Sequence, residues 1–112
     1  MAVNALSQGA WLAKLAASLD DSPGLLIKTG AGMLHGWSVV GAGAGYVQVF
    51  DAAALTDVTL GTTTPDFAIP VSTTFNSVVG MDWPFSLGCV VFCATTATGA
   101  TGQTANGTFS YA

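Results

Sequence analysis

The chain has 112 residues, of which 51% are hydrophobic and only 7% are charged. This length fits one domain and is sufficient to bury a core without metals or disulfides. Six acidic and two basic residues give a net charge of −4. That balance argues against nucleic-acid binding, because phosphate contacts need clusters of Lys or Arg. No apolar stretch reaches the roughly 18 residues of a membrane span, and the N-terminus lacks the basic start of a signal peptide.

Charged side chains are scarce, since the sequence contains neither Glu nor Arg. In ordinary soluble domains about a quarter of all residues are charged. A folded monomer of this size exposes roughly 5,700 Å². Most of that surface must consist of Gly, Ala, Thr, Ser and apolar groups, which favours burial in an assembly over a free monomer. The alternative is a neutral surface, rich in Thr and Ser, that stays soluble on its own.

The first expected element is a short amphipathic helix within residues 1–22. Apolar residues recur there at spacings of three and four, as on one face of a helix. They are Val3, Leu6, Trp11, Leu12, Leu15 and Leu19. The turn-forming residues from Asp20 to Gly24 end the helix. We expect residues 1–22 to form an N-terminal arm that docks on a neighbouring chain. The alternative is a helix packed on its own domain.

From Gly24 onward, β-branched and aromatic residues alternate with turns of Gly, Thr and Ala, which predicts short strands. The expected strands are Leu25–Thr29, Met33–Gly41, Tyr46–Phe50, Phe67–Val71, Phe75–Trp83, Leu87–Thr95 and Gly107–Tyr111. No helical pattern of crossover length separates them, so the sequence predicts an all-β fold, an antiparallel β-sandwich over residues 23–112. We expect the second, fifth and sixth of these strands to supply most of the core.

The only histidine, His35, is the one candidate for a general base. On a strand it would share a face with Met33, Trp37 and Val39. This favours a histidine whose ring nitrogens have hydrogen-bond partners in the core or at an interface. No Gly-x-Ser-x-Gly elbow accompanies it. We therefore expect that the chain is not an enzyme and has no catalytic residues.

Acidic residues and cysteines are the remaining candidates for site chemistry. Asp51, Asp57 and Asp66 could supply a sparse set of calcium ligands, but solvated loop carboxylates are the favoured interpretation. Cys89 and Cys93 lie four apart on one expected strand, too far apart for a disulfide. They would act as small buried apolar side chains, and free thiols fit a reducing cytoplasm. We expect no metal site and no cofactor.

The aromatic residues offer a possible sugar-stacking platform. Because the chain has no Arg and few amides to complement it, packing in the core and at interfaces is the favoured role for these rings. We take as candidate assembly contacts Trp11, Leu12, Leu15, Leu19, Trp37, Tyr46, Trp83 and Tyr111.

Several runs of the sequence resemble a pattern found in small structural proteins of tailed bacteriophages. They are 36–40 (GWSVV), 46–53 (YVQVFDAA), 57–65 (DVTLGTTTP), 83–88 (WPFSLG), 94–96 (ATT) and 108–112 (TFSYA). Over residues 24–112 the chain is similar to head decoration proteins, also called cement proteins. Residues 1–23 fall outside the resemblance.

The resemblance implies a jelly-roll-like sandwich and the role of a structural virion protein on the outer capsid surface. The expected partners are the major capsid protein and further copies of the chain, with a trimer favoured, after assembly in the host cytoplasm. Neither nucleic acid nor a membrane is an expected partner. The alternative function is a tail, spike or fibre module that binds a glycan on the host surface. The resemblance brings no catalytic residues with it.

Overall fold

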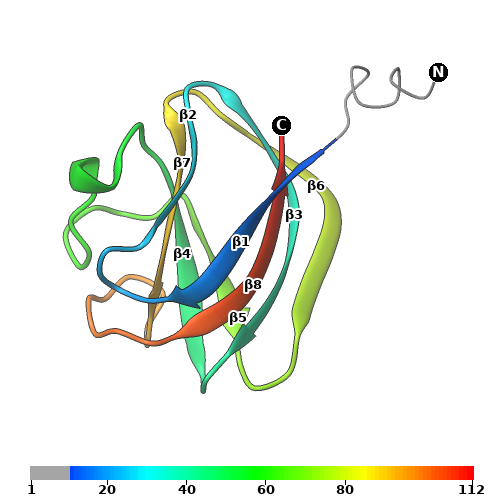
Figure 1. The fold of residues 1–112 in the computed structure, drawn as a ribbon. Helices are drawn as coiled ribbons and strands as arrows, with labels where there is room; N and C mark the ends of the chain where they lie inside the picture. The colour runs from blue at the N-terminus through cyan, green and yellow to red at the C-terminus, as the bar shows by residue number, and fades with distance from the viewer. Residues whose placement is uncertain (1–10) are drawn as a thin grey trace.

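The computed structural model describes residues 11–112, which fold into two stacked β-sheets (Figure 1). The strands are β1 (Leu12–Leu19), β2 (Leu25–Thr29), β3 (Gly32–Gly41), β4 (Gly45–Asp51), β5 (Phe67–Val71), β6 (Asn76–Phe85), β7 (Gly88–Ala94) and β8 (Ala105–Tyr111), with a 3-10 turn at Leu55–Asp57. Sheet A has the order β1-β8-β3-β6 and sheet B the order β2-β7-β4-β5. All paired strands run antiparallel. The predicted all-β sandwich is confirmed, and the strand order is that of a jelly roll.

The main core fills the space between the two sheets. Alternate residues of each strand point inward, as period-two geometry requires, and Phe109 of β8 and Leu34 of β3 are fully buried there. Sheet B contributes its own inward residues, including Val47 and Val91. Every residue of β7 is buried, as its continuous apolar run predicted.

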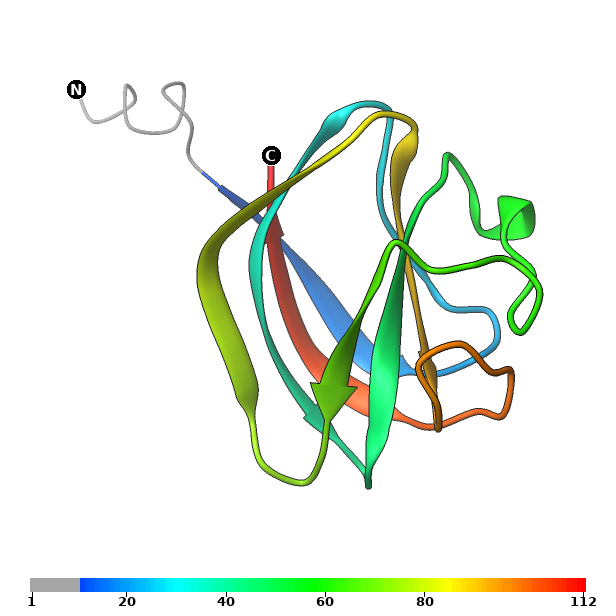
Figure 2. The ribbon, with the colours of Figure 1, turned by 180° about the vertical axis from the view of Figure 1, so that it is seen from behind.

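A second apolar cluster lies on the other face of sheet B. Phe50, Val90 and Phe92 form its centre, and the loop between β4 and β5 packs Leu55 and further apolar side chains onto it. The loop between β7 and β8 lies on the same side of the molecule (Figure 2). Sheet B is therefore covered on both faces, whereas the described residues 11–112 cover sheet A on its inner face alone.

The N-terminal segment differs from its prediction, because residues 12–19 form strand β1 and not a helix. Ala16 and Leu19 both reach the core although they lie three residues apart. A register shift between them, with Ser18 at a φ of +53°, accounts for this helix-like spacing. The boundary at residue 22 is also wrong, since β1 pairs with β8 of the same sandwich. The part of the arm prediction that concerns residues 1–10 lies outside the described residues.

The expectation that the strand Phe75–Trp83 supplies core residues is wrong for most of its length. Phe75 is 63% exposed and Val79 is 80% exposed, and the fully buried residue of β6 is Phe85. A register shift between β3 and β6 contains Gly80 and Asp82, both at positive φ. Beyond this irregularity the other set of alternate residues points inward. Val79 therefore faces outward, whereas Trp83 and Phe85 face the core.

Candidate functional site

The outer side of sheet A is not covered by another element of residues 11–112, and we call it the open face. Lys14 of β1 pairs with the buried Phe109, so both side chains point inward and the neighbours of Lys14 point outward. The same alternation on the other strands defines the rest of the face. Its residues are Ala13, Leu15, Ala17, Gly36, Ser38, Val40, Ser77, Val79, Asn106, Thr108 and Ser110.

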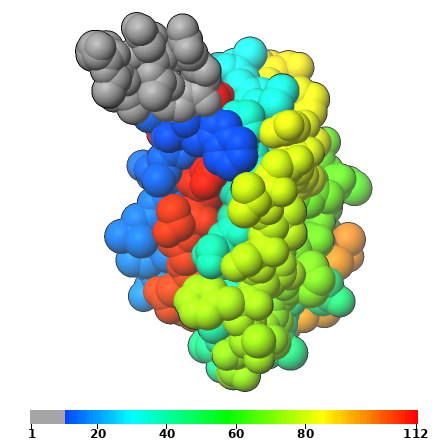
Figure 3. Space-filling view, turned by 90° about the vertical axis from the view of Figure 1, so that its right-hand side faces the viewer, coloured from blue at the N-terminus to red at the C-terminus, as the bar shows by residue number. Residues whose placement is uncertain are grey.

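Two rows of residues cross the open face from β1 to β6. The strand registers align one row as Leu15, Thr108, Ser38 and Ser77, and the next as Ala13, Ser110, Gly36 and Val79. Neither row contains a charge, and the central residues are small. Figure 3 shows the four strands of sheet A side by side on this surface. The result is a neutral sheet face with large apolar side chains on its two edge strands.

The apolar side chains of the open face are strongly exposed. Leu15 on β1 is 69% exposed, and Val79 lies on the opposite edge strand. On β6, two residues before Val79, Ser77 donates its hydroxyl to the hydroxyl of Ser38 on the inner strand β3 at 3.0 Å. Because these two hydroxyls satisfy each other in part, covering the centre of the face costs less than covering unpaired polar groups.

A cluster of three side chains stands at one end of sheet A. The Nδ1 of His35 lies 2.6 Å from a carboxylate oxygen of Asp82. The ring of Trp11 stacks on His35 with centroids 4.3 Å apart and planes 6° from parallel. The predicted sharing of a face with Trp37 and Val39 is wrong, because the register shift around His35 separates it from these core-facing residues. His35 thus has an acidic partner and an aromatic one.

The edge strands of both sheets carry features that discourage pairing with a further strand. The two cations of the sequence lie on edge strands, Lys14 inward on β1 and Lys28 on β2 beside a register shift. The other edges contain prolines, Pro70 in β5 and Pro84 in β6, which cannot donate to a ladder. These features favour association of this fold through a face of the sandwich and not through its edges.

The predicted assembly contacts separate into exposed and covered residues. Trp11, Leu12 and Leu15 are exposed at β1. Leu19 is only 4% exposed, so its prediction as a surface contact is wrong. The partly buried rings of Trp37, Trp83 and Tyr111 pack against the main core, and Tyr46 is half-buried on β4. Val79 is absent from the predicted contacts, because its alternation with Met81 and Trp83 predicted a core position.

The three candidate calcium ligands line one cavity of about 230 Å³ beside the loop between β4 and β5. The carboxylate of Asp51 accepts hydrogen bonds from the backbone N–H groups of Ser86, Leu87 and Gly88 at 2.9, 2.8 and 3.3 Å. Asp66 accepts the backbone N–H of Asp51 at 2.7 Å. Within residues 11–112, no three acidic, histidine or cysteine side chains lie close enough together to hold a metal ion.

These hydrogen bonds also set the ionisation of Asp51. Partial burial raises the pKa of its carboxyl, but the backbone N–H groups of Ser86, Leu87 and Gly88 outweigh this and lower the pKa below its ordinary value. A stably ionised Asp51 therefore joins the end of β4 to the turn between β6 and β7. Its role in the described structure is to hold this turn.

The two cysteines lie on β7 with their side chains in the main core, and both are free thiols. Burial, followed by the nearby carboxylates of Asp51 and Asp66, raises the pKa of Cys89 to about 12. Burial and Asp20 raise the pKa of Cys93 to about 11. Such thiols are poor nucleophiles and behave as the apolar side chains that the sequence predicted.

No helix within residues 11–112 is long and apolar enough to cross a membrane. Comparisons with protein-family models, with curated proteins and with solved structures find no match to the chain. The fold and the surfaces of the molecule therefore carry the functional argument.

Proposed function

We propose that the chain is a structural virion protein, a capsid decoration subunit that binds the outer capsid shell and neighbouring copies of itself. The observation that supports this function best is the open face, whose two rows of residues across four strands carry no charge and are uncovered by residues 11–112. The solvated face of an antiparallel sheet is usually polar, whereas this one exposes the apolar side chains of Leu15 and Val79. Jelly rolls occur in capsid proteins, lectins and enzymes alike, so the fold by itself does not distinguish among these classes.

The proposed mechanism is stabilisation by burial of surface at the joints of a shell. Each 1,000 Å² of apolar surface removed from water contributes a gross ~25 kcal/mol. The loss of translational and rotational freedom and the ordering of side chains offset much of this gain. The remainder acts at every joint that a subunit covers, so even a modest net contribution per copy strengthens the particle as a whole.

The alternative of a glycan-binding tail or spike module has less support. Such a site needs aromatic rings exposed side by side, with polar groups around them. Trp37 and Trp83 instead pack against the core, where each contacts Phe67. Trp11 is partly exposed, but one of its faces is occupied by His35.

Purified particles from the source of this sequence test the proposed function. We expect the chain to be present in a copy number comparable to that of the shell subunits, as measured by quantitative mass spectrometry. Particles assembled without it should release their contents at a lower temperature than complete particles. Absence of the chain from purified particles, or a particle stability that does not depend on it, would contradict the proposal.

A further inference from the structure

We infer that the open face is a contact between two copies of the chain, packed sheet against sheet. This inference rests on the proposed function as an assembly subunit and names the partner that the open face receives. A single surface that meets itself is related by a two-fold axis, so the contact produces a dimer and not the trimer that the resemblance implies. The features that support a second copy as the occupant are the distribution of charge, the area of the face and the state of the strand edges.

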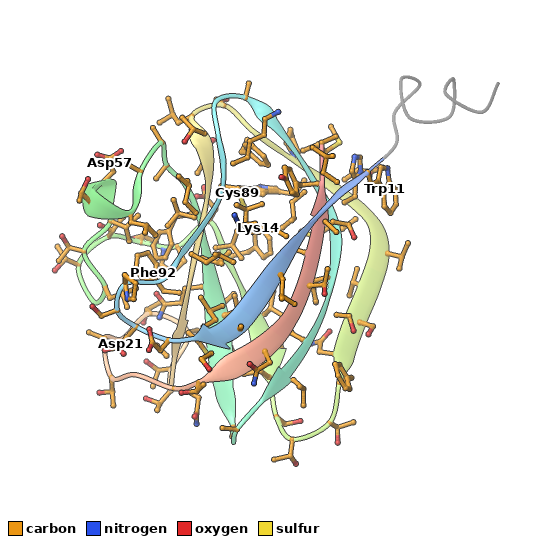
Figure 4. All side chains as sticks on the ribbon, viewed as in Figure 1. Trp11, Lys14, Asp21, Asp57, Cys89 and Phe92 are labelled. Atoms are coloured by element: carbon orange, nitrogen blue, oxygen red, sulfur yellow. The ribbon has the colours of Figure 1, made fainter. Side chains whose placement is uncertain are left out.

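The distribution of charge favours a second copy. Five of the six carboxylates lie outside the open face, in the turn after β1, at the end of β4 and in the loop between β4 and β5. These residues are Asp20, Asp21, Asp51, Asp57 and Asp66. Figure 4 shows Asp21 and Asp57 on the side of sheet B, away from Trp11 at sheet A. Two copies that meet through sheet A therefore keep most of their negative charge apart.

Distance and salt weaken the remaining repulsion. Carboxylates on the side of sheet B are separated from the contact by the thickness of the sandwich, because its two sheets are about 10 Å apart. Solvent-exposed charges of the two copies are therefore farther apart than the Debye length of about 8 Å at physiological ionic strength, and salt largely screens them. The sixth carboxylate, Asp82, lies on the outer side of sheet A at its end, because its neighbour Trp83 packs on the core, and its partner His35 lies 2.6 Å away. A strongly charged macromolecule, in contrast, would find no charge of opposite sign in the two rows that cross the face.

The area of the face fits a reversible dimer. Four strands spaced about 4.8 Å apart, each presenting about eight residues at about 3.3 Å, cover roughly 500 Å². Two copies together would bury roughly 1,000 Å², which is near the lower limit for a specific protein contact. Small residues such as Ser38 and Gly36 at the centre let the two sheets approach to ordinary packing distance. Leu15 and Val79 supply exposed apolar contacts at the edges.

The edges of the sheets direct association toward this face. Lys14 points inward on β1, and Pro84 interrupts the donor row of β6, so neither edge of sheet A is suited to receive another strand. The outer face of sheet B is already covered by the second apolar cluster. Among the residues described, sheet A thus has one free surface for contact with another sheet.

Sedimentation equilibrium of the full chain, at concentrations up to about 1 mM, tests this inference. We expect a concentration-dependent monomer–dimer equilibrium for the wild-type chain. Leu15→Lys and Val79→Lys should each weaken the dimer at least tenfold, because each places an unpaired charge in the contact. Leu87→Lys is the matched control, since Leu87 is 59% exposed but lies in the turn before β7, outside the open face. It should leave the dimer unchanged.

Circular dichroism and thermal melting of each variant establish that the fold is intact before the masses are compared. A wild-type chain that stays monomeric over the whole range would overturn the inference. Dimers that are not weakened by either Leu15→Lys or Val79→Lys, or that dissociate with Leu87→Lys, would place the contact elsewhere. Either result would also overturn the inference. If deletion of residues 1–10 converts a monomer into a dimer, the N-terminal segment occupies the face, which again contradicts a second copy in the full chain.

The outcome is independent of the test of the proposed function. A chain that is monomeric in solution but abundant on purified particles would refute the dimer contact and leave the decoration function standing. A dimer that is absent from purified particles would retain the contact and refute the decoration function.

Discussion

Phe92 is a buried member of the second apolar cluster, on the outer face of sheet B. Its ring lies across that of Phe50, with centroids 5.9 Å apart and an interplanar angle of 84°. We predict that Phe92→Ala lowers the free energy of unfolding by about 3–5 kcal/mol, because it leaves a cavity beneath the loop between β4 and β5. Phe75→Ala is the control, since Phe75 is exposed, and it should change the free energy by less than about 1 kcal/mol. Chemical denaturation measures both, and equal effects would show that the cluster is not packed as described.

Asp51 gives the molecule a testable dependence on pH. Its pKa is lower in the folded chain than its ordinary value of 3.8, because backbone N–H groups bind the ionised form. The ionised carboxylate therefore stabilises the fold above pH 3.8, and this contribution is lost as the pH falls through the lower, folded-state pKa. We predict that Asp51→Asn lowers stability by about 1 kcal/mol at neutral pH, through weaker hydrogen bonds.

The difference between wild type and Asp51→Asn should be constant above pH 3.8 and become smaller below it. Thermal melting of the two proteins across this range is the measurement. Asp57→Asn is a suitable control, because Asp57 lines the same cavity without the three backbone donors. A difference that grows as the pH falls would contradict the assignment of Asp51.

At the scale of elements, β1 is part of the sandwich, and its removal should unfold the domain. Deletion of residues 1–19 removes the buried Ala16 and Leu19 and exposes the length of β8 that pairs with β1. We predict loss of the cooperative thermal transition and of near-ultraviolet circular dichroism. Deletion of residues 1–10 alone leaves all the described contacts in place and should preserve the transition. If the protein without residues 1–19 still folded, this segment would be an arm, as the sequence predicted, and not part of the sandwich.

Alternation of apolar and polar residues was enough to place most strands. The bounds of Leu25–Thr29 and Phe67–Val71 are the same in the sequence prediction and in the structure. Prediction failed where a bulge changes the period, near Ser18 in β1 and near Asp82 in β6, both non-glycine residues at positive φ. Such residues seldom adopt this conformation, so no local pattern marks the position at which the inward face changes.

At the scale of the whole molecule, composition predicted a surface suited to contact but not its location. The scarcity of charge is a property of the entire chain. Which neutral residues share a surface depends on the strand order and register, which bring Leu15, Ser38 and Val79 together from distant parts of the sequence. The sequence favoured solvated loop carboxylates over calcium ligands for Asp51, Asp57 and Asp66, whereas in the fold Asp51 and Asp66 accept hydrogen bonds from backbone N–H groups.

Location of the chain in a density map of the intact particle tests the decoration function most directly. We predict copies of a two-sheet sandwich on the outside of the shell, over joints between shell subunits, with density that fits the jelly-roll order of residues 11–112. Density for the sandwich confined to the tail or its fibres, with none on the shell, would contradict the account and favour the glycan-binding alternative.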